Sequence, residues 1–283
     1  MSFISEDRSS KSLPIRCTQA LIGALRKARP ELTLTGHGYV SKPAENTLPG
    51  VKLQQFASDL EQGDGNELEG KFLAAHSSSA LAVNCFAPFK DAIADLSLLD
   101  ANSFEEIQFE RKCPTGLRGG RAPNLDVVAE AKAHVVAIES KCTEYLSTKP
   151  AKFSPAYAEQ IRDERRESAW FREMLDLDAG VVSYRFLDTA QLVKHAFGVA
   201  RCFKGKSATL LYLYWEPANA ADLPEFGGHG EEIARLGERV DGAFPRFEAL
   251  SYPELWMSWE TSRCPPWLRD HLLALRARYL VAI

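Results

Sequence analysis

The sequence predicts an α/β or α+β domain built on a mixed β-sheet with helices on its faces. The first observation is the order of the segments: helical segments come first, a meander of short β-rich runs follows, and helix then alternates with strand. The second is the composition, in which 45% apolar and 25% charged residues are ordinary for a globular chain. The third is the length of 283 residues, which is enough to bury a core without disulfide or zinc support.

The N-terminal third is predicted to be helical with long connections. Apolar residues at helical spacing predict a first helix that ends before Pro30. Asn66 stands three residues before Glu69, and this capping-box-like pair predicts the start of another helix. The helical segments expected here are 15–29, 51–60, 66–75 and 80–86.

The rest of the chain is predicted to alternate between strands and helices. Alternating apolar side chains indicate strands, and the apolar spacing of helices returns between them. The strands expected are 104–112, 125–131, 134–141 and 208–215. The helices expected are 155–175, 190–203, 231–244 and 266–282, and segment 247–259 is expected to be strand-like or irregular.

The cysteines and the N-terminal segment indicate a cytoplasmic protein. The six cysteines are scattered without a C-x-x-C pair, so we interpret them as reduced thiols. The segment 1–12 is polar and lacks the apolar core of a secretory signal. No apolar run approaches the length needed to span a membrane, so no membrane partner is expected.

Charge is unevenly distributed along the chain. The formal net charge is −4, with 34 basic and 38 acidic residues, which excludes a uniformly basic coat for nucleic acid. Segments 111–121 and 189–215 nevertheless carry basic residues and no acid. Ordinary variation of a solvated surface explains either segment alone, and each gains meaning only if it lies beside a catalytic centre.

Three charged residues interrupt the apolar runs of the predicted hairpin 125–141. If Lys132 and Ala133 form a two-residue turn, the residue numbers of every opposed pair add up to the same total as 132 and 133. The numbers of Asp126 and Glu139 add up to that total, so these two residues lie opposite each other on one face of the sheet. Lys141 lies on the same face as Glu139, since side chains alternate along a strand. A three-residue loop would turn Asp126 away.

Two carboxylates at cross-strand distance repel each other and favour a bound cation. With no His or Cys near them in the motif, the oxygen ligands point to Mg²⁺ or Mn²⁺. Lys141 can orient an attacking water and stabilise charge on a phosphate. The alternative is a half-exposed hairpin whose polar face carries Asp126, Glu139 and Lys141 without a metal.

The motif D126-x12-E139-S-K141 on two adjacent strands resembles the PD-(D/E)xK nuclease superfamily, although Pro123 stands three residues before Asp126 instead of next to it. The resemblance covers about 67–215. It implies a restriction-endonuclease-like mixed β-sheet flanked by helices, with extra helices at both ends. It also implies a further metal-binding glutamate upstream, for which Glu69 is the best match and Glu67 its rival. Helix capping is the competing role of Glu69.

The resemblance divides the chain into three parts and adds candidate DNA contacts. The parts are an N-terminal helical extension (1–62), a nuclease-like core (63–221) and an acidic C-terminal α/β part packed on it (222–283). In the exonuclease branch a Gln is followed by a Tyr near the site, and Gln191 and His195 have that spacing here. A core or surface histidine is the alternative for His195. The DNA-binding candidates are Arg118, Arg121, Gln191, Lys194 and His195.

These observations predict an Mg²⁺- or Mn²⁺-dependent deoxyribonuclease, and the resemblance implies a restriction or defence endonuclease. Asp126, Glu139 and Glu69 would hold the metal, and Lys141 would position the water. The alternatives are an inactive nuclease-fold module that binds nucleic acid or a protein, and a subunit that cuts only with a partner chain. A homodimer fits an enzyme that cuts both strands. The sequence has no phosphate-loop motif, so no nucleotide cofactor is expected. The sequence does not show whether the substrate is DNA or RNA, or whether the enzyme cuts at chain ends or in chain interiors.

Overall fold

A five-stranded mixed sheet forms the centre of the protein in the computed structural model, which describes residues 12–62, 66–117, 122–147, 152–159, 168–262 and 264–283. The strands, in spatial order, are β1 (Glu106–Lys112), β2 (Asn124–Glu130), β3 (His134–Lys141), β4 (Ser207–Tyr214) and β5 (Arg246–Ser251). The first three form an antiparallel meander, whereas β3, β4 and β5 run parallel. The predicted α/β class with a mixed sheet is therefore confirmed.

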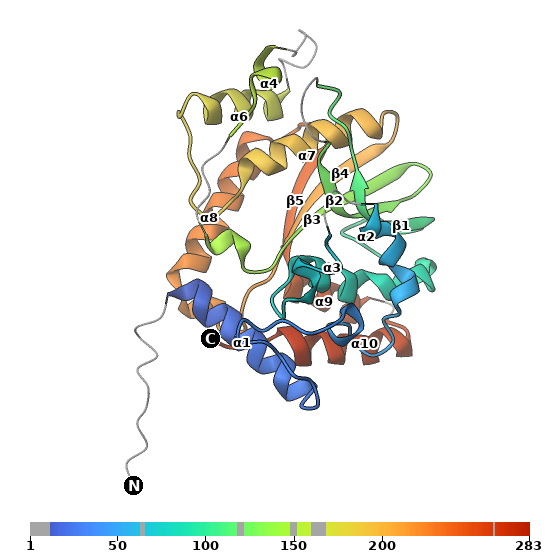
Figure 1. Ribbon diagram of the computed structural model, residues 1–283. Coiled ribbons are helices and arrows are strands. Elements are labelled where there is room, and N and C mark those ends of the chain that lie inside the picture. Colours follow the sequence, from blue (N-terminus) through green and yellow to red (C-terminus); the bar gives the residue numbers. More distant parts are fainter. Residues whose placement is uncertain (1–11, 63–65, 118–121, 148–151, 160–167, 263) are drawn as a thin grey trace.

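Helices cover both faces of this sheet (Figure 1). The α-helices described are α1 (Leu13–Ala28), α2 (Ala57–Glu61), α3 (Ser78–Phe86), α4 (Pro155–Glu159), α6 (Ala169–Asp178), α7 (Thr189–Cys202), α8 (Pro224–Arg239), α9 (Tyr252–Thr261) and α10 (Pro266–Tyr279). One hydrophobic core joins the sheet to α1, α3, α9 and α10, and the other joins it to α6, α7 and α8. The protein thus has three layers, as an α/β sheet with two apolar faces requires.

The alternation of side chains along the strands decides which layer each one enters. Val128 and Ala137 belong to the core beneath α7, whereas Val127 and Ile138 belong to the core beneath α3. Residues two apart in a strand share a face. The odd positions of β3 and Val128 of β2 therefore point toward α7. Leu125 also lies in that core, so the alternation of β2 is interrupted between Leu125 and Val127.

The first and last helices lie against each other, far from each other in the sequence. α1 begins with Leu13 and Pro14 and buries a face that includes Cys17, Leu21 and Leu25. It packs beside α10, and the buried Arg278 of α10 donates hydrogen bonds to the backbone oxygens of Leu21 and Ala75 (Figure 1). The expected extra helices at both ends of the chain are present.

The prediction of a helix that begins at Asn66 is wrong. Residues 67–70 form turns, and a short 3-10 helix follows at Lys71–Leu73. The side chain of Asn66 donates a hydrogen bond to Glu69 instead of capping a helix. α3 begins after Ser77, whose hydroxyl accepts a hydrogen bond from the backbone N–H of Ala80 at 3.1 Å.

Two C-terminal expectations are corrected as well. The helix expected over 231–244 begins earlier, at Pro224, because buried Phe226 and His229 anchor a first turn that its glycines disfavour. Segment 247–259 divides into β5 and α9, and a capping box between Ser251 and Glu254 starts the helix. That S-x-x-E pattern was present in the sequence.

The long helix expected over 155–175 falls partly outside the described residues. α4 covers its first turn, and α6 begins at Ala169. Within the part of the chain that the structure describes, every helix is too short or too polar to cross a membrane.

Candidate functional site

The hairpin of β2 and β3 has the register that the sequence predicts. Val127 pairs with Ile138, and the N–H of Ala131 donates to the oxygen of His134 at 2.9 Å across a two-residue turn. Continuing this register by one pair puts Asp126 opposite Glu139. The ladder pairing ends at Val127 and Ile138, and the next residues along the two strands, Asp126 and Glu139, both line one cavity.

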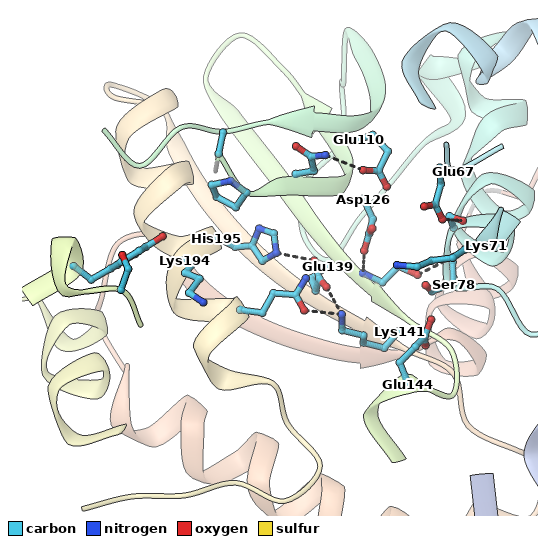
Figure 2. A pocket seen from close by; sticks show the side chains of 18 residues that line it. Glu67, Lys71, Ser78, Glu110, Asp126, Glu139, Lys141, Glu144, Lys194 and His195 are labelled. Carbon is cyan, nitrogen blue, oxygen red and sulfur yellow. Dashed lines mark hydrogen bonds and ion pairs between the residues drawn. The ribbon is translucent and has the colours of Figure 1, made fainter. Parts of the chain in front are cut away.

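A cavity of about 800 Å³ opens at this end of the sheet. Strands β2 and β3 contribute Asp126, Glu139 and Lys141, and helix α7 contributes residues from its first two turns (Figure 2). The α7 residues that line it are Gln191, Lys194 and His195. Six of the predicted site residues, from the hairpin and from α7, therefore lie in one cavity.

Glu139 is almost completely buried, with 1% of its surface exposed, and is surrounded by basic groups. Lys141 Nζ lies 2.5 Å from Glu139 Oε1 and donates a second hydrogen bond to Gln191 Oε1 at 2.8 Å. Burial acts to raise the pKa of Glu139, but the charge of Lys141 and the contacts with Lys141 and His195 outweigh it and lower that pKa to about 2. Glu139 is therefore ionised.

Lys141 remains protonated in the same environment. Burial acts to lower the pKa of Lys141, but the charges of Glu139 and Asp126 outweigh it and raise that pKa above its ordinary value. An ammonium held in this way can donate hydrogen bonds and stabilise negative charge, but it does not accept a proton.

His195 lies on the other side of Glu139. Its Nε2 is 2.9 Å from Glu139 Oε2, and only 1% of its surface is exposed. Among the described residues, neither of these two atoms has a well-aligned hydrogen-bond partner. The sequence places no histidine near the acids of the motif, but the fold brings His195 next to Glu139.

The pKa of Asp126 is shifted in the opposite direction to that of Glu139. Its Oδ2 accepts a hydrogen bond from the backbone N–H of Ser140 at 2.6 Å. Burial, and then the charges of Glu139 and Glu110, raise the pKa of Asp126 well above its usual value, although Lys141 opposes this. Asp126 is thus a crowded carboxyl group that a cation would stabilise.

The sequence analysis missed Glu110 in β1. The β1–β2 register pairs Phe109 with Val127 and Arg111 with Leu125, so Glu110 lies opposite Asp126, and it lines the cavity. Its φ of 49° is unusual for a residue with a side chain. Burial, and then the charge of Glu67, raise the pKa of Glu110 to about 7. An acid inside a predicted strand was the available signal, but nothing local fixed the register of that strand.

Of the two upstream acids, Glu67 and not Glu69 lines the cavity. Glu67 Oε1 accepts a hydrogen bond from Ser79 Oγ at 2.8 Å, whereas Glu69 is exposed and accepts one from Asn66. The turn that replaces the expected helix separates the directions of the two side chains.

The other candidate DNA contacts are placed less completely. Lys194 lines the cavity and donates a hydrogen bond to the backbone oxygen of Lys152 at 2.8 Å. Lys71 lines the cavity from the opposite side (Figure 2). Arg118 and Arg121 lie outside the described residues.

The donor atoms of the cavity fit a hard divalent ion bound by few protein ligands. Within the described ranges, no three His, Cys, Asp or Glu side chains are grouped closely enough to hold a metal by themselves. Mg²⁺ commonly uses one or two carboxylates and takes its other ligands from water and substrate phosphates. Asp126 and Glu139 meet that requirement, and Glu139 Oε2 is a buried carboxylate oxygen without a well-aligned hydrogen bond.

Comparison with known protein families gives a match that spans nearly the whole chain. Residues 19–280 match the model of a protein family described as Restriction Endonuclease associating with ARP. No curated protein and no solved structure matches the chain significantly. The mixed five-stranded sheet flanked by helices is compatible with a restriction-endonuclease-like fold.

Proposed function

The chain belongs to the family described as Restriction Endonuclease associating with ARP, and we propose that it is a metal-dependent nuclease of the PD-(D/E)xK type that hydrolyses phosphodiester bonds in DNA. The observation that carries this proposal is the convergence of Asp126, Glu139 and Lys141 on one cavity from adjacent strands. The family supports nuclease-type chemistry, and the three side chains supply the groups that phosphodiester hydrolysis needs.

Asp126 and Glu139 are the residues that would hold Mg²⁺ or Mn²⁺. The ion, when bound, supplies positive charge against the scissile phosphate. The raised pKa of Asp126 supports this role, because a bound cation relieves the repulsion that Glu139 and Glu110 exert on it. Glu67 lines the same cavity, and we assign it, in place of Glu69, as the upstream acid of the site.

Lys141 would orient the attacking water and stabilise charge on the phosphate. Its Nζ is held by Glu139 Oε1 and Gln191 Oε1, so two contacts fix its position while a third N–H is free of these two acceptors. Because its pKa is raised, Lys141 acts as a hydrogen-bond donor and a positive charge, and a different group must take the proton of the water.

DNA is the proposed substrate, and basic residues on both sides of the cavity support phosphate binding. Lys71 and Lys194 line opposite sides of it, with Lys141 between them (Figure 2). Contacts from lysine to phosphate give sequence-independent affinity. A restriction or defence endonuclease that cuts duplex DNA as a homodimer is the specific form of this proposal.

A cleavage assay with isosteric variants tests the proposal. Supercoiled plasmid, linear duplex, single-stranded DNA and RNA are incubated with the purified protein and Mg²⁺ or Mn²⁺, with EDTA as the metal-free control. We expect plasmid nicking or cutting, and an at least about 100-fold slower reaction for Asp126→Asn, with unchanged or tighter DNA binding. Glu106→Gln neutralises an exposed acid on β1 outside the cavity and should leave the rate unchanged.

Three results would contradict this function as proposed. Equal cleavage by wild type and Asp126→Asn would assign the activity to another site or a contaminant. DNA binding without cleavage on any substrate, with either ion, would favour the inactive binding module. Cleavage that begins only when a partner protein is added would favour the partner-dependent subunit.

A further inference from the structure

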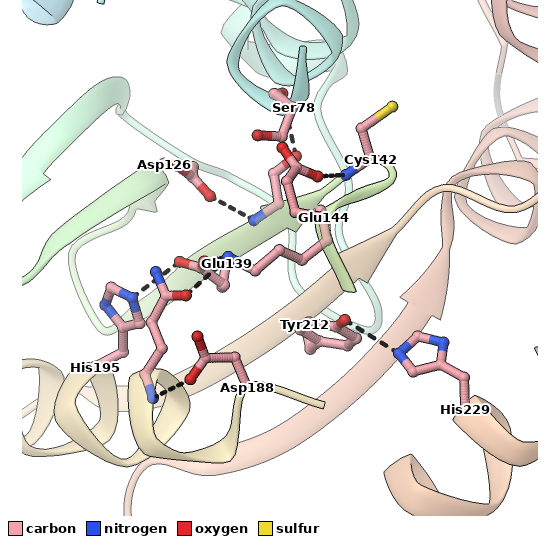
Figure 3. A network of polar contacts seen from close by, with 12 residues as sticks. Ser78, Asp126, Glu139, Cys142, Glu144, Asp188, His195, Tyr212 and His229 are labelled. Atoms are coloured by element: carbon pink, nitrogen blue, oxygen red, sulfur yellow. Dashed lines mark hydrogen bonds and ion pairs between the residues drawn. The ribbon is translucent and has the colours of Figure 1, made fainter. Parts of the chain in front are cut away.

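His195 is a buried polar side chain for which the proposed chemistry has no role. It lies in the second turn of α7, 1% exposed, and its ring faces Glu139 at the wall of the cavity (Figure 3). Nε2 has an ion-pair contact with Glu139 Oε2, but neither Nδ1 nor Nε2 has a well-aligned hydrogen-bond partner among the described residues. Burying a polar group without a well-aligned hydrogen bond costs free energy, so the binding of a ligand to this group is favoured.

The contact between His195 and Glu139 has the spacing of two ligands on one ion. Nε2 and Oε2 are 2.9 Å apart, yet the two atoms do not align into a hydrogen bond. Two donors at right angles, each about 2.1 Å from an ion, are about 3 Å apart. The pair can therefore accept an ion with little movement of either side chain.

Helix α7 keeps the two oxygens of Glu139 in separate environments. Asp188 caps the helix by accepting a hydrogen bond from the N–H of Gln191 at 3.1 Å. Gln191 accepts a hydrogen bond from Lys141, which occupies Oε1 of Glu139. Gln191 and His195 are four residues apart on one helix face, so the same helix leaves Oε2 to the imidazole.

We propose that His195 Nε2 is a metal ligand beside Glu139 Oε2, and that the site therefore prefers Mn²⁺ to Mg²⁺. A neutral imidazole is a good ligand for transition-metal dications, whereas Mg²⁺ strongly prefers oxygen. Glu139 would supply the oxygen ligand next to the imidazole, and water and substrate phosphates would complete the coordination. The inference rests on the proposed function for the catalytic use of the ion, but its test measures binding alone.

Pulsed electron paramagnetic resonance of the Mn²⁺-loaded protein tests this directly. A nitrogen bound to Mn²⁺ gives a ¹⁴N coupling, which we expect in wild type and not in His195→Gln. His229 is equally buried but faces Tyr212 and not Glu139, so His229→Gln is the matched control and should keep the signal. Calorimetric titration should show Mn²⁺ binding weakened about tenfold or more by His195→Gln, with a smaller effect on Mg²⁺.

The outcomes separate this inference from the proposed function. Bound Mn²⁺ without ¹⁴N coupling in wild type overturns the ligand role of His195 and leaves a metal-dependent nuclease intact. A coupling that persists in folded His195→Gln overturns the assignment to this residue. Failure of wild type to bind Mn²⁺ or Mg²⁺ overturns both, and the wild-type signal decides the matter even if the variant does not fold.

Discussion

The two sides of the cavity carry carboxyl groups in opposite electrostatic situations. On the β3–α7 side, Glu139 is neighboured by Lys141 and His195, and its pKa is lowered to about 2. On the β1–β2 side, Asp126 and Glu110 face each other, and both pKa values are raised. The acids lie on three neighbouring strands of one sheet, yet among the described residues Glu139 alone of these three forms an ion pair with a lysine.

The difference shows that charge compensation, and not burial, separates the two sides. Glu139 is the most buried of these acids, and burial alone would raise its pKa. Its ionised state depends on Lys141, two positions along the same strand, and on the contact with His195 of α7. On the β1–β2 side Lys141 and Lys71 offset the burial and repulsion of the acids only in part, and a divalent ion would supply the remaining positive charge.

The largest expected effect comes from removing the compensation of Glu139. Lys141→Met leaves a buried carboxylate without its ammonium, which typically costs about 3–5 kcal/mol of unfolding free energy. The double variant Lys141→Met with Glu139→Gln should recover most of this loss. Urea unfolding at pH 7 measures all three proteins, and additive losses would show that the pair is not coupled.

A smaller effect is expected on the β1–β2 side as pH changes. Glu110 has a folded pKa of about 7 against an ordinary 4.5, so the folded state holds the proton between these values and the unfolded state does not. Its contribution to stability is therefore present below pH 4.5 and is lost as pH rises to about 7, by about 1–3 kcal/mol.

Unfolding of the metal-free protein, with EDTA present, measures this contribution. Glu110→Gln keeps the size of the side chain and removes its charge, so its unfolding free energy should fall less than that of wild type from pH 4.5 to 7. Glu106→Gln, an exposed change on the same strand, serves as the control and should follow wild type. Parallel curves for Glu110→Gln and wild type would contradict the crowding of acids on this side.

The smallest effect is a gain in stability from the residue proposed to bind metal. Asp126→Asn removes a repelled charge and keeps an oxygen that can accept from the N–H of Ser140. We expect the unfolding free energy of the metal-free protein to rise by about 1 kcal/mol at pH 7, while cleavage is lost. Calorimetric unfolding measures the change, and a loss of stability would mean that the carboxylate is not crowded.

Expectations based on short-range pattern were confirmed more often than those that needed distant contacts. The hairpin was predictable because a two-residue turn fixes the pairing of every position beyond it. The helix at Asn66 was wrong because a capping pattern is also satisfied by the hydrogen bond from Asn66 to Glu69 within a turn. The start of α8 was missed because the burial of Phe226 and His229 outweighs the low helix propensity of glycine.

The sequence by itself determined the register of the β2–β3 hairpin, the face shared by Glu139 and Lys141, and the α/β class, because turn length and side-chain alternation are local properties. Only the tertiary structure decided that Glu110 and Glu67 line the cavity and that His195 lies against Glu139. These contacts depend on the register of β1 across a long connection and on the packing of α7 over the sheet. Both are determined by burial summed over many distant residues, which no single segment contains.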